Sequence, residues 1–246
     1  MDSEFSIVGA GISGLTAGCA LQKISRTTHV YEKLKKINEF GAGISLSPNG
    51  TKPLQRLGVL NDLIKTSHTP DKIVVRSYSS GKEIVSISLN EKKQNKFLTL
   101  DRKELIQILL KRYMDLGGII STSCEVSKID NLDKDLVFSD GRRVSSDVIL
   151  ACDGIKSKIR ELYFDNTKPS YTNYVAWRGI SDIGSLPKLK DNQAINLWYG
   201  PEGHVVHYPI GRKGKVNFVG IKVSNIWTDQ SWRIEADKIA RLDSKD

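Results

Sequence analysis

A glycine-rich turn near the start of the chain constrains the fold more than any other feature of the sequence. The apolar residues 5–8 predict a buried strand, and the motif Gly9-x-Gly11-x-x-Gly14 follows it directly. Gly9 permits a tight turn, Gly11 lets the backbone approach a pyrophosphate at the positive end of the next helix, and Gly14 lets that helix lie close to the sheet. The helix is predicted to run to about Ile24.

A second apolar run, residues 29–31, ends at Glu32. A carboxylate at this position can accept hydrogen bonds from both ribose hydroxyls of an adenosine. The strand, helix, strand and acidic residue together match a βαβ dinucleotide-binding fingerprint, and Ile12, Ser13 and Lys33 are predicted to belong to the same cofactor site. The alternative is a glycine-rich turn that holds no ligand.

The composition is that of a soluble globular protein: 246 residues, of which 39% are hydrophobic and 26% charged. No apolar run approaches the length of a membrane span, and the first strand begins too early for a signal peptide. Cys19, Cys124 and Cys152 lie far apart without the spacing of a metal site, which indicates a reducing compartment and no metal. We therefore expect a cytoplasmic protein without stable membrane insertion.

The net charge is +9, with 37 lysines and arginines against 28 acidic residues. The lysines are scattered, and no basic stripe interleaved with aromatic residues accompanies them, so the sequence predicts no nucleic-acid partner. A basic surface would help to attract anionic substrates and cofactors.

After Glu32, a plain Rossmann dehydrogenase would continue with another crossover helix and strand. This chain instead continues with residues 41–50, Gly-Ala-Gly-Ile-Ser-Leu-Ser-Pro-Asn-Gly. Their glycines predict a loop that passes close to a ligand, and Gly43 and Ile44 are assigned to the cofactor site. Ser47 and Pro48 predict the start of a helix that stops at Gly58. A further short helix is predicted over residues 60–66.

The rest of the chain contains two kinds of β structure. Residues 73–89 predict a hairpin whose second strand alternates at Val85, Ile87 and Leu89. Four β-rich segments between residues 174 and 223 predict a second, antiparallel sheet, which the hairpin joins.

We therefore expect an α/β fold in which a Rossmann-like, parallel-sheet domain is combined with a smaller antiparallel β-sheet domain. The expected boundaries are residues 1–70 and 99–170 for the first domain, 71–98 and 171–230 for the second, and 231–246 for the start of a helix, which is amphipathic from Asp229 onward.

Two further helix starts carry polar residues. Asp101 and Glu104 have the spacing of a capping box, which begins a helix at Arg102. Residues 143–145 and 147–151 predict two separate strands, and the second, fully apolar one leads to Asp153 and Gly154. Because ligands bind beyond the carboxyl ends of such strands, these two residues are predicted to reach the ligand, the alternative being a helix cap at Asp153.

The order of these motifs resembles the group A flavoprotein monooxygenases, the FAD-dependent aromatic hydroxylases built like p-hydroxybenzoate hydroxylase. Residues 174–179 (Tyr-Val-Ala-Trp-Arg-Gly) and 203–209 (Gly-His-Val-Val-His-Tyr-Pro) are similar to the salicylate hydroxylase and 6-hydroxynicotinate 3-monooxygenase branch. The resemblance implies that the fingerprint glycines and Glu32 hold the ADP half of FAD. It also implies that Arg102 lies near the FAD phosphates and ribityl chain, and that Asp153-Gly154 serves both FAD and NAD(P)H.

The resemblance further implies a reaction in which NADH or NADPH reduces FAD, and the C4a-hydroperoxyflavin formed with O2 hydroxylates a small phenolic or aromatic-acid substrate. On a strand over residues 204–210, His204 and Tyr208 share a face and are predicted to deprotonate the substrate, with His207 as the rival base. Arg178 is predicted to pair with a substrate carboxylate, or else to form a structural ion pair. Ser45 stands where the hydroxynicotinate branch often has a histidine, which is a departure from that branch.

The family continues with a Gly-Asp-Ala-Ala-His type motif that closes over FAD, and this chain does not contain it. We expect a chain that is truncated relative to the family, that holds FAD weakly on its own and does not turn over. An exposed apolar face would make it a homodimer or the partner of a complementing C-terminal fragment. Two other functions stay open: a flavin-dependent NAD(P)H oxidase or dehydrogenase, and a non-catalytic FAD- or nucleotide-binding fragment.

Overall fold

The computed structural model describes residues 3–37, 42–89, 96–130, 135–164, 169–185, 193–212 and 214–225. The chain divides into two compact units. Unit 1 takes the described residues within Met1–Thr69, Lys92–Pro169 and Ile210–Lys213, and unit 2 those within Pro70–Glu91, Ser170–Pro209 and Gly214–Asp246. The helix predicted from Asp229 onward lies outside the described residues.

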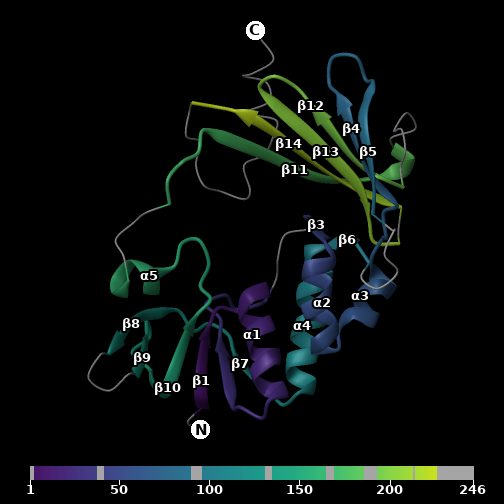
Figure 1. Ribbon diagram of the computed structural model, residues 1–246. Helices are drawn as coiled ribbons and strands as arrows, with labels where there is room; N and C mark the ends of the chain where they lie inside the picture. The colour runs from purple at the N-terminus through teal and green to yellow at the C-terminus, as the bar shows by residue number, and fades with distance from the viewer. Residues whose placement is uncertain are drawn as a thin grey trace. The chain divides into compact units, whose positions relative to one another are not determined.

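Unit 1 is built on a six-stranded sheet in the order β7-β2-β1-β10-β9-β8 (Figure 1). The strands are β1 Ser3–Val8, β2 Thr28–Tyr31, β7 Ile119–Ser121, β8 Val126–Asp130, β9 Asp135–Phe138 and β10 Arg143–Ala151. Strands β7, β2, β1 and β10 are parallel, whereas β9 and β8 continue the sheet in antiparallel pairs.

Strand β10 is a single nine-residue strand, so the prediction of two strands over residues 143–145 and 147–151 is wrong. Its first part pairs with β9 and its second part with β1. Ser146 joins the two parts: it lies opposite Ser3, is buried, and its hydroxyl is hydrogen-bonded to that of Ser6. A buried polar side chain with a partner does not interrupt a strand, and this pairing could not be read from local sequence.

The helices of unit 1 are α1 Ile12–Lys23, α2 Pro48–Leu57, α3 Leu60–Thr66, α4 Arg102–Asp115 and α5 Lys158–Tyr163. Helix α4 begins as predicted, because the Asp101 carboxylate accepts the Lys103 N–H at 2.9 Å. It packs against α1, where the fully buried Tyr113 ring lies 2.6 Å from the position that a Cβ on Gly18 would occupy. The core of unit 1 therefore requires a glycine on α1 for the two helices to approach.

Residues 43–46 form strand β3 (Gly43–Leu46) and not the predicted loop. It pairs antiparallel with β6 (Leu98–Asp101), with Ile44 opposite Leu100. Leu98 and Leu100 are fully buried, so the apolar side chains in this segment stabilise a strand where the glycines alone suggested a loop. Gly41 lies outside the described residues.

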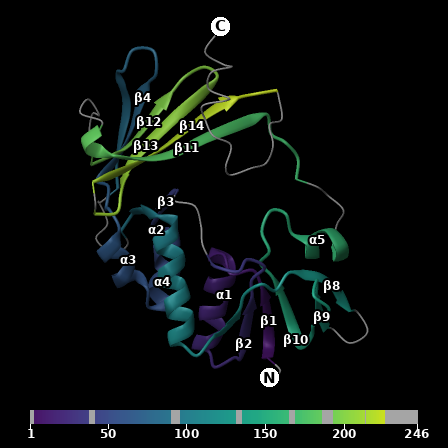
Figure 2. The same cartoon turned by 180° about the vertical axis from the view of Figure 1, so that it is seen from behind.

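Unit 2 is a six-stranded sheet in the order β11-β14-β13-β12-β4-β5 (Figure 2). The strands are β4 Lys72–Ser77, β5 Glu83–Ser88, β11 Tyr174–Asp182, β12 Ile195–Tyr199, β13 Gly203–Ile210 and β14 Lys215–Val223, with a short 3-10 turn at Ile183–Ser185. The sheet is not purely antiparallel as predicted, because β12 and β4 pair in parallel. The β4–β5 hairpin is thereby joined to strands more than 100 residues away in sequence.

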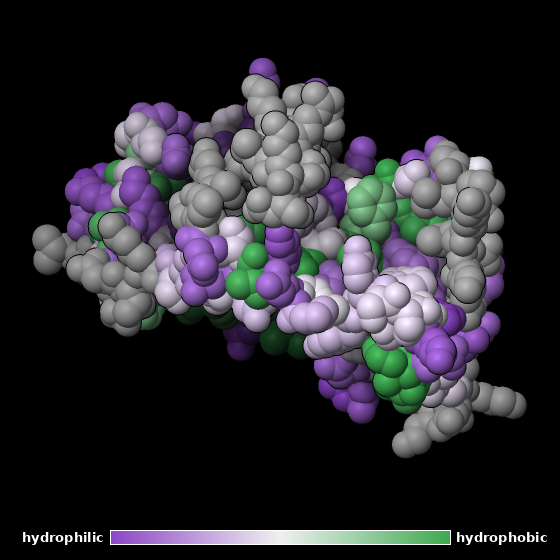
Figure 3. All heavy atoms as spheres, turned by 90° about the horizontal axis from the view of Figure 1, so that it is seen from above, coloured by the Kyte–Doolittle hydropathy of each residue, from purple (hydrophilic) through white to green (hydrophobic). Residues whose placement is uncertain are grey.

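Strand β5 is exposed along its whole length, including Val85 and Ile87. The alternation in its sequence suggested one buried face, but β5 is the edge of the sheet and pairs on one side only. Across the face of the molecule in Figure 3, hydrophilic and hydrophobic residues are intermixed, as on an ordinary protein surface. None of the helices in the described ranges is both long enough and apolar enough to cross a bilayer.

Candidate cofactor and substrate sites

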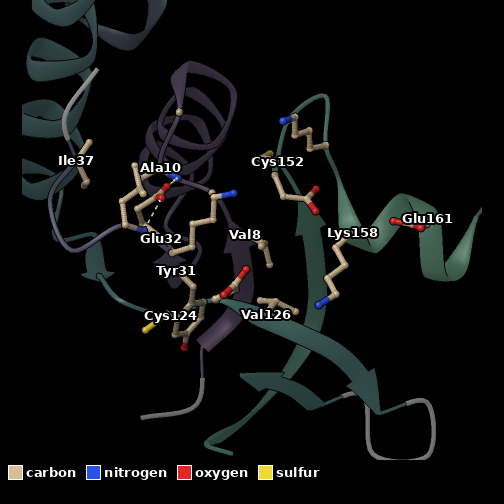
Figure 4. Close-up of a pocket in the computed structure, with 18 of the residues that line it drawn as sticks. Val8, Ala10, Tyr31, Glu32, Ile37, Cys124, Val126, Cys152, Lys158 and Glu161 are labelled. Carbon is tan, nitrogen blue, oxygen red and sulfur yellow. Dashed lines mark hydrogen bonds between the residues drawn. The ribbon is translucent and has the colours of Figure 1, made fainter. Parts of the chain in front are cut away.

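A cavity of about 480 Å³ lies at the carboxyl ends of β1, β2 and β10, the edge at which open α/β sheets bind ligands (Figure 4). It brings together many of the residues predicted to bind a cofactor, which come from four separate segments of unit 1. Those that line it are Gly9, Gly11, Glu32, Lys33, Arg102, Asp153 and Gly154.

The N-terminus of α1 faces this cavity. Gly9 has a φ of +103°, and a Cβ there would lie 2.5 Å from the Cys152 carbonyl oxygen. A Cβ on Gly14 would lie 1.9 Å from the Gly9 carbonyl oxygen, whereas one on Gly11 would meet nothing within 4 Å. The three glycines thus have different roles: two allow close packing, and the third leaves open space at a helix end that attracts anions.

The Glu32 carboxylate is held in place by two backbone groups (Figure 4). The Ala10 N–H donates to Oε2 at 2.8 Å and the Leu34 N–H donates to Oε1 at 2.9 Å. Each carboxylate oxygen can accept a further hydrogen bond, so the carboxylate is fixed beside the turn and can still receive hydroxyl donors.

Arg102 is the first residue of α4, and its own N–H donates to the Ala42 carbonyl at 2.9 Å. This bond ties the helix start to the residue before β3 and sets the guanidinium at the cavity. Gly43 and Ile44, on β3 itself, are not among the lining residues, and neither are Ile12 and Gly14. Ser13 lines a smaller adjoining hollow of about 320 Å³ together with Asp153 and Gly154.

In unit 2, the predicted catalytic residues His204 and Tyr208 lie on β13. His204 is opposite Tyr199 on β12, and the two rings stack with centroids 5.6 Å apart. Because side chains alternate along a strand, His204, Val206 and Tyr208 share one face. His204 is partly exposed, whereas Tyr208 is only 6% exposed.

Arg178 lies on the same face of the sheet as His204 and Tyr208. The Val223 N–H donates to the Glu202 carbonyl, which sets the register between the neighbouring strands β13 and β14 and puts Val206 opposite Val219. Val219 in turn is opposite Arg178 on β11. Cross-strand partners project to the same side, so the structure places the three predicted side chains on one face.

The rival base, His207, projects to the other face and is buried. Its ring stacks on Trp198 with centroids 6.3 Å apart, and its Nε2 has no hydrogen-bond partner in the described structure. Burial, with a smaller contribution from the Arg76 charge, lowers the pKa of His207 to about 4.

A second cavity, of about 520 Å³, lies along the sheet of unit 2, and its lining residues include Trp177, Val205 and Gly220. His204 also lines this cavity. Tyr208, Arg178 and His207 are not among its lining residues.

The model of the FAD-binding domain family matches residues 2–224. The chain belongs to this family. The predicted family resemblance, the α/β fold class and FAD as the cofactor are therefore confirmed for this FAD-binding chain.

Two curated monooxygenases are similar to this chain. The 3-amino-4-hydroxybenzoate 2-monooxygenase PtnB3 of Streptomyces platensis is 28% identical over 235 residues, which cover 93% of this chain and 59% of that protein. The 6-hydroxynicotinate 3-monooxygenase of Bordetella bronchiseptica is 27% identical over 242 residues, covering 93% of this chain and 61% of that protein. The FAD-binding chain thus spans about three fifths of the length of these relatives.

Solved structures show the same fold. CtdE in complex with FAD and a substrate superposes with a TM-score of 0.83 at 21% identity, covering 98% of this chain and 62% of that one. A variant of Klebsiella pneumoniae HpxO complexed with FAD superposes with a TM-score of 0.81 at 25% identity, covering 98% of this chain and 61% of that one.

The cavity residues fit the chemistry of FAD. The open space at Gly11 and the N–H groups of the first turn of α1, which have no acceptor within the helix, suit a pyrophosphate. The Asp153 Oδ2 accepts the Ile159 N–H at 3.3 Å, but Oδ1 is buried without a hydrogen-bond partner in the described residues. A buried acceptor of this kind suits a ligand hydroxyl. The alternative role predicted for Asp153 was that of a helix cap. Asp153 does contact α5, but the N-cap of α5 is Ser157, which accepts the Arg160 N–H at 3.0 Å.

Several residues that line this cavity were not predicted from the sequence. They follow the ends of β2 and β7 or belong to the segment around α5: Leu34, Ile37, Cys124, Glu125, Val126, Lys156, Lys158 and Glu161. The position of β7 beside β2 would have indicated residues 124–126, because neighbouring parallel strands end at the same edge. That adjacency has no local sequence signal.

Replacing Glu32 with alanine should weaken FAD binding by about 1–3 kcal/mol, because a charged acceptor and the anchor of the turn are both lost. Glu32→Gln, which keeps one acceptor oxygen, should have a smaller effect. Fluorescence titration with FAD measures both. Equal FAD affinity of Glu32→Ala and the unmodified chain would contradict the assignment.

Proposed function

We propose that the chain serves in an FAD-dependent monooxygenase that uses NADH or NADPH and O2 to hydroxylate a small phenolic or aromatic-acid substrate. The observation that carries the proposal is the cavity at the end of β1, β2 and β10, in a chain of the FAD-binding family whose curated relatives carry the names of aromatic monooxygenases. When bound, FAD supplies the redox chemistry that passes electrons from NAD(P)H to oxygen and an oxygen atom to the ring.

The residues of unit 1 hold and orient the cofactor. The N-terminus of α1 and Gly11 receive the pyrophosphate, and Glu32 accepts the ribose hydroxyls of the adenosine. Arg102 offers a planar, permanently charged group to the phosphates and the ribityl chain. The Asp153 Oδ1, which has no hydrogen-bond partner among the described residues, accepts a cofactor hydroxyl beside Gly154.

The shared face of unit 2 receives the substrate. His204, stacked on Tyr199 and partly exposed, is the base that takes the phenolic proton, and the Tyr208 hydroxyl relays or holds it. Arg178, on the same face, pairs with the substrate carboxylate. Burial and the low pKa of His207 make it a poor proton acceptor near neutral pH, which favours His204 as the base.

The catalytic roles can be tested in a chimera in which residues 1–225 replace the matching part of the B. bronchiseptica 6-hydroxynicotinate 3-monooxygenase. We expect His204→Ala combined with Tyr208→Phe to lower the rate of hydroxylation by about 100-fold or more, the scale of a lost general base. Product formation and NAD(P)H consumption are measured separately by chromatography and absorbance.

The matched control is His207→Phe, which removes the buried imidazole on the other face and should leave the rate of hydroxylation within a small factor. Full hydroxylation by the double variant would contradict the assignment. NAD(P)H consumption that yields hydrogen peroxide and no hydroxylated product, in the chimera with native His204 and Tyr208, would favour the oxidase alternative.

A further inference from the structure

The cofactor cavity of unit 1 extends past Glu32 in two directions (Figure 4). One direction leads to Ala10 at the turn into α1, and the other to Val126 and Lys158. The N-terminus of α1 attracts anions, so Ala10, at the turn into that helix, marks the direction of the pyrophosphate and the remainder of FAD. The adenine base, on the far side of the ribose held at Glu32, then lies in the other direction.

That second direction has an apolar floor. Val8, Tyr31, Cys124 and Val126 are between 2% and 8% exposed and belong to one hydrophobic cluster of unit 1. A flat heteroaromatic base gains free energy when one of its faces covers such a surface, whereas a phosphate loses hydration there. The floor therefore suits the base and no other part of the dinucleotide's ADP half.

Helix α5 is fixed beside this floor by bonds at both of its ends. At its start, Ile159 is buried in the same cluster and its N–H donates to Asp153. At its end, the Tyr163 hydroxyl donates to the Ile129 carbonyl and accepts the Ile129 N–H on β8, both at 2.7 Å. Lys158, the first residue of α5, is thereby held at the rim of the cavity, and its side chain extends toward the part where Val126 lies (Figure 4).

We propose that Lys158 contacts the adenine base of the bound dinucleotide and that the base lies over Val126. Within the described part of the chain, the Lys158 ammonium pairs with no carboxylate, so it is available to donate to a ring nitrogen or to lie on the face of the base. Lys158 is thus a positioning residue for the adenine end, selecting a dinucleotide over the mononucleotide FMN. The inference depends on the FAD-binding cavity and not on hydroxylation.

The test compares two lysines of the same cavity in the full 246-residue chain, Lys158→Met and Lys156→Met. Both variants remove one exposed positive charge, so they change the long-range attraction for anions to the same extent. Isothermal titration calorimetry with ADP and with inorganic pyrophosphate separates contact with the base from attraction for phosphate. Circular dichroism confirms that both variants are folded.

We expect Lys158→Met to weaken ADP binding by about tenfold relative to Lys156→Met, the scale of one cation–base contact or charged hydrogen bond. The two variants should bind pyrophosphate equally. Equal ADP affinities in the two variants, or an equal loss of ADP and pyrophosphate affinity in Lys158→Met, would overturn the proposal. Failure of the unmodified chain to bind ADP would overturn it as well, whereas loss of hydroxylation alone would bear only on the proposed reaction.

Discussion

Replacing Gly14 with alanine is expected to destabilise unit 1 by on the order of 3 kcal/mol and to abolish FAD binding. The added Cβ would lie 1.9 Å from the Gly9 carbonyl oxygen and 3.3 Å from the Ile7 side chain. A backbone carbonyl cannot rotate away as a flexible side chain can, so α1 must shift from β1 and the turn at Gly9 must change. Thermal unfolding and FAD titration measure the two effects.

Gly11→Ala is the matched control for this prediction. Its Cβ would meet nothing within 4 Å, so we expect the free energy of unfolding to change little. The same methyl group enters the space that we assign to the pyrophosphate, so FAD binding should still fall. Equal destabilisation by Gly11→Ala and Gly14→Ala would contradict the division of roles between the two glycines.

Acidification from pH 7 to pH 4 is expected to lower the free energy of unfolding of unit 2 by about 3 kcal/mol through His207 alone. Burial lowers its pKa from 6.5 to about 4, and the Arg76 charge acts in the same direction. Between these two pKa values the unfolded chain binds a proton that the folded chain does not. The stabilisation is therefore complete above pH 6.5, is lost as the pH falls, and is fully lost below about pH 4.

His207→Phe should flatten this pH profile, because a phenyl ring can keep the stacking on Trp198 and carries no titratable group. Urea unfolding between pH 4 and pH 7, followed by tryptophan fluorescence, measures the slope. His29→Gln is the control: the pKa of His29 is also lowered, mainly by burial, but His29 lies in unit 1, so its variant should keep the slope of unit 2. An unchanged slope in His207→Phe would refute the assignment.

The sequence predicted the elements that depend on neighbouring residues. The βαβ unit with its three glycines, the cap at Asp101 and the helix stop at Gly58 are contacts over a few residues, and the structure forms each of them. The errors lie where pairing partners are distant. Residues 43–46 become a strand because β6 lies beside them, and β10 stays continuous because β9 and β1 support its two halves.

The sequence by itself determined that the chain binds a dinucleotide, since the turn at Gly9, the open helix end at Gly11 and the carboxylate at Glu32 are encoded within the first 32 residues. Only the tertiary structure decided what lies around that fingerprint. The floor at Val126 and the rim at Lys158 depend on which strands end at one edge of the sheet and on where α5 is anchored. Likewise, the common face of Arg178, His204 and Tyr208 depends on the register of β11, β14 and β13. Strand order and register are set by packing between segments far apart in sequence, and a one-residue slip would reverse every face.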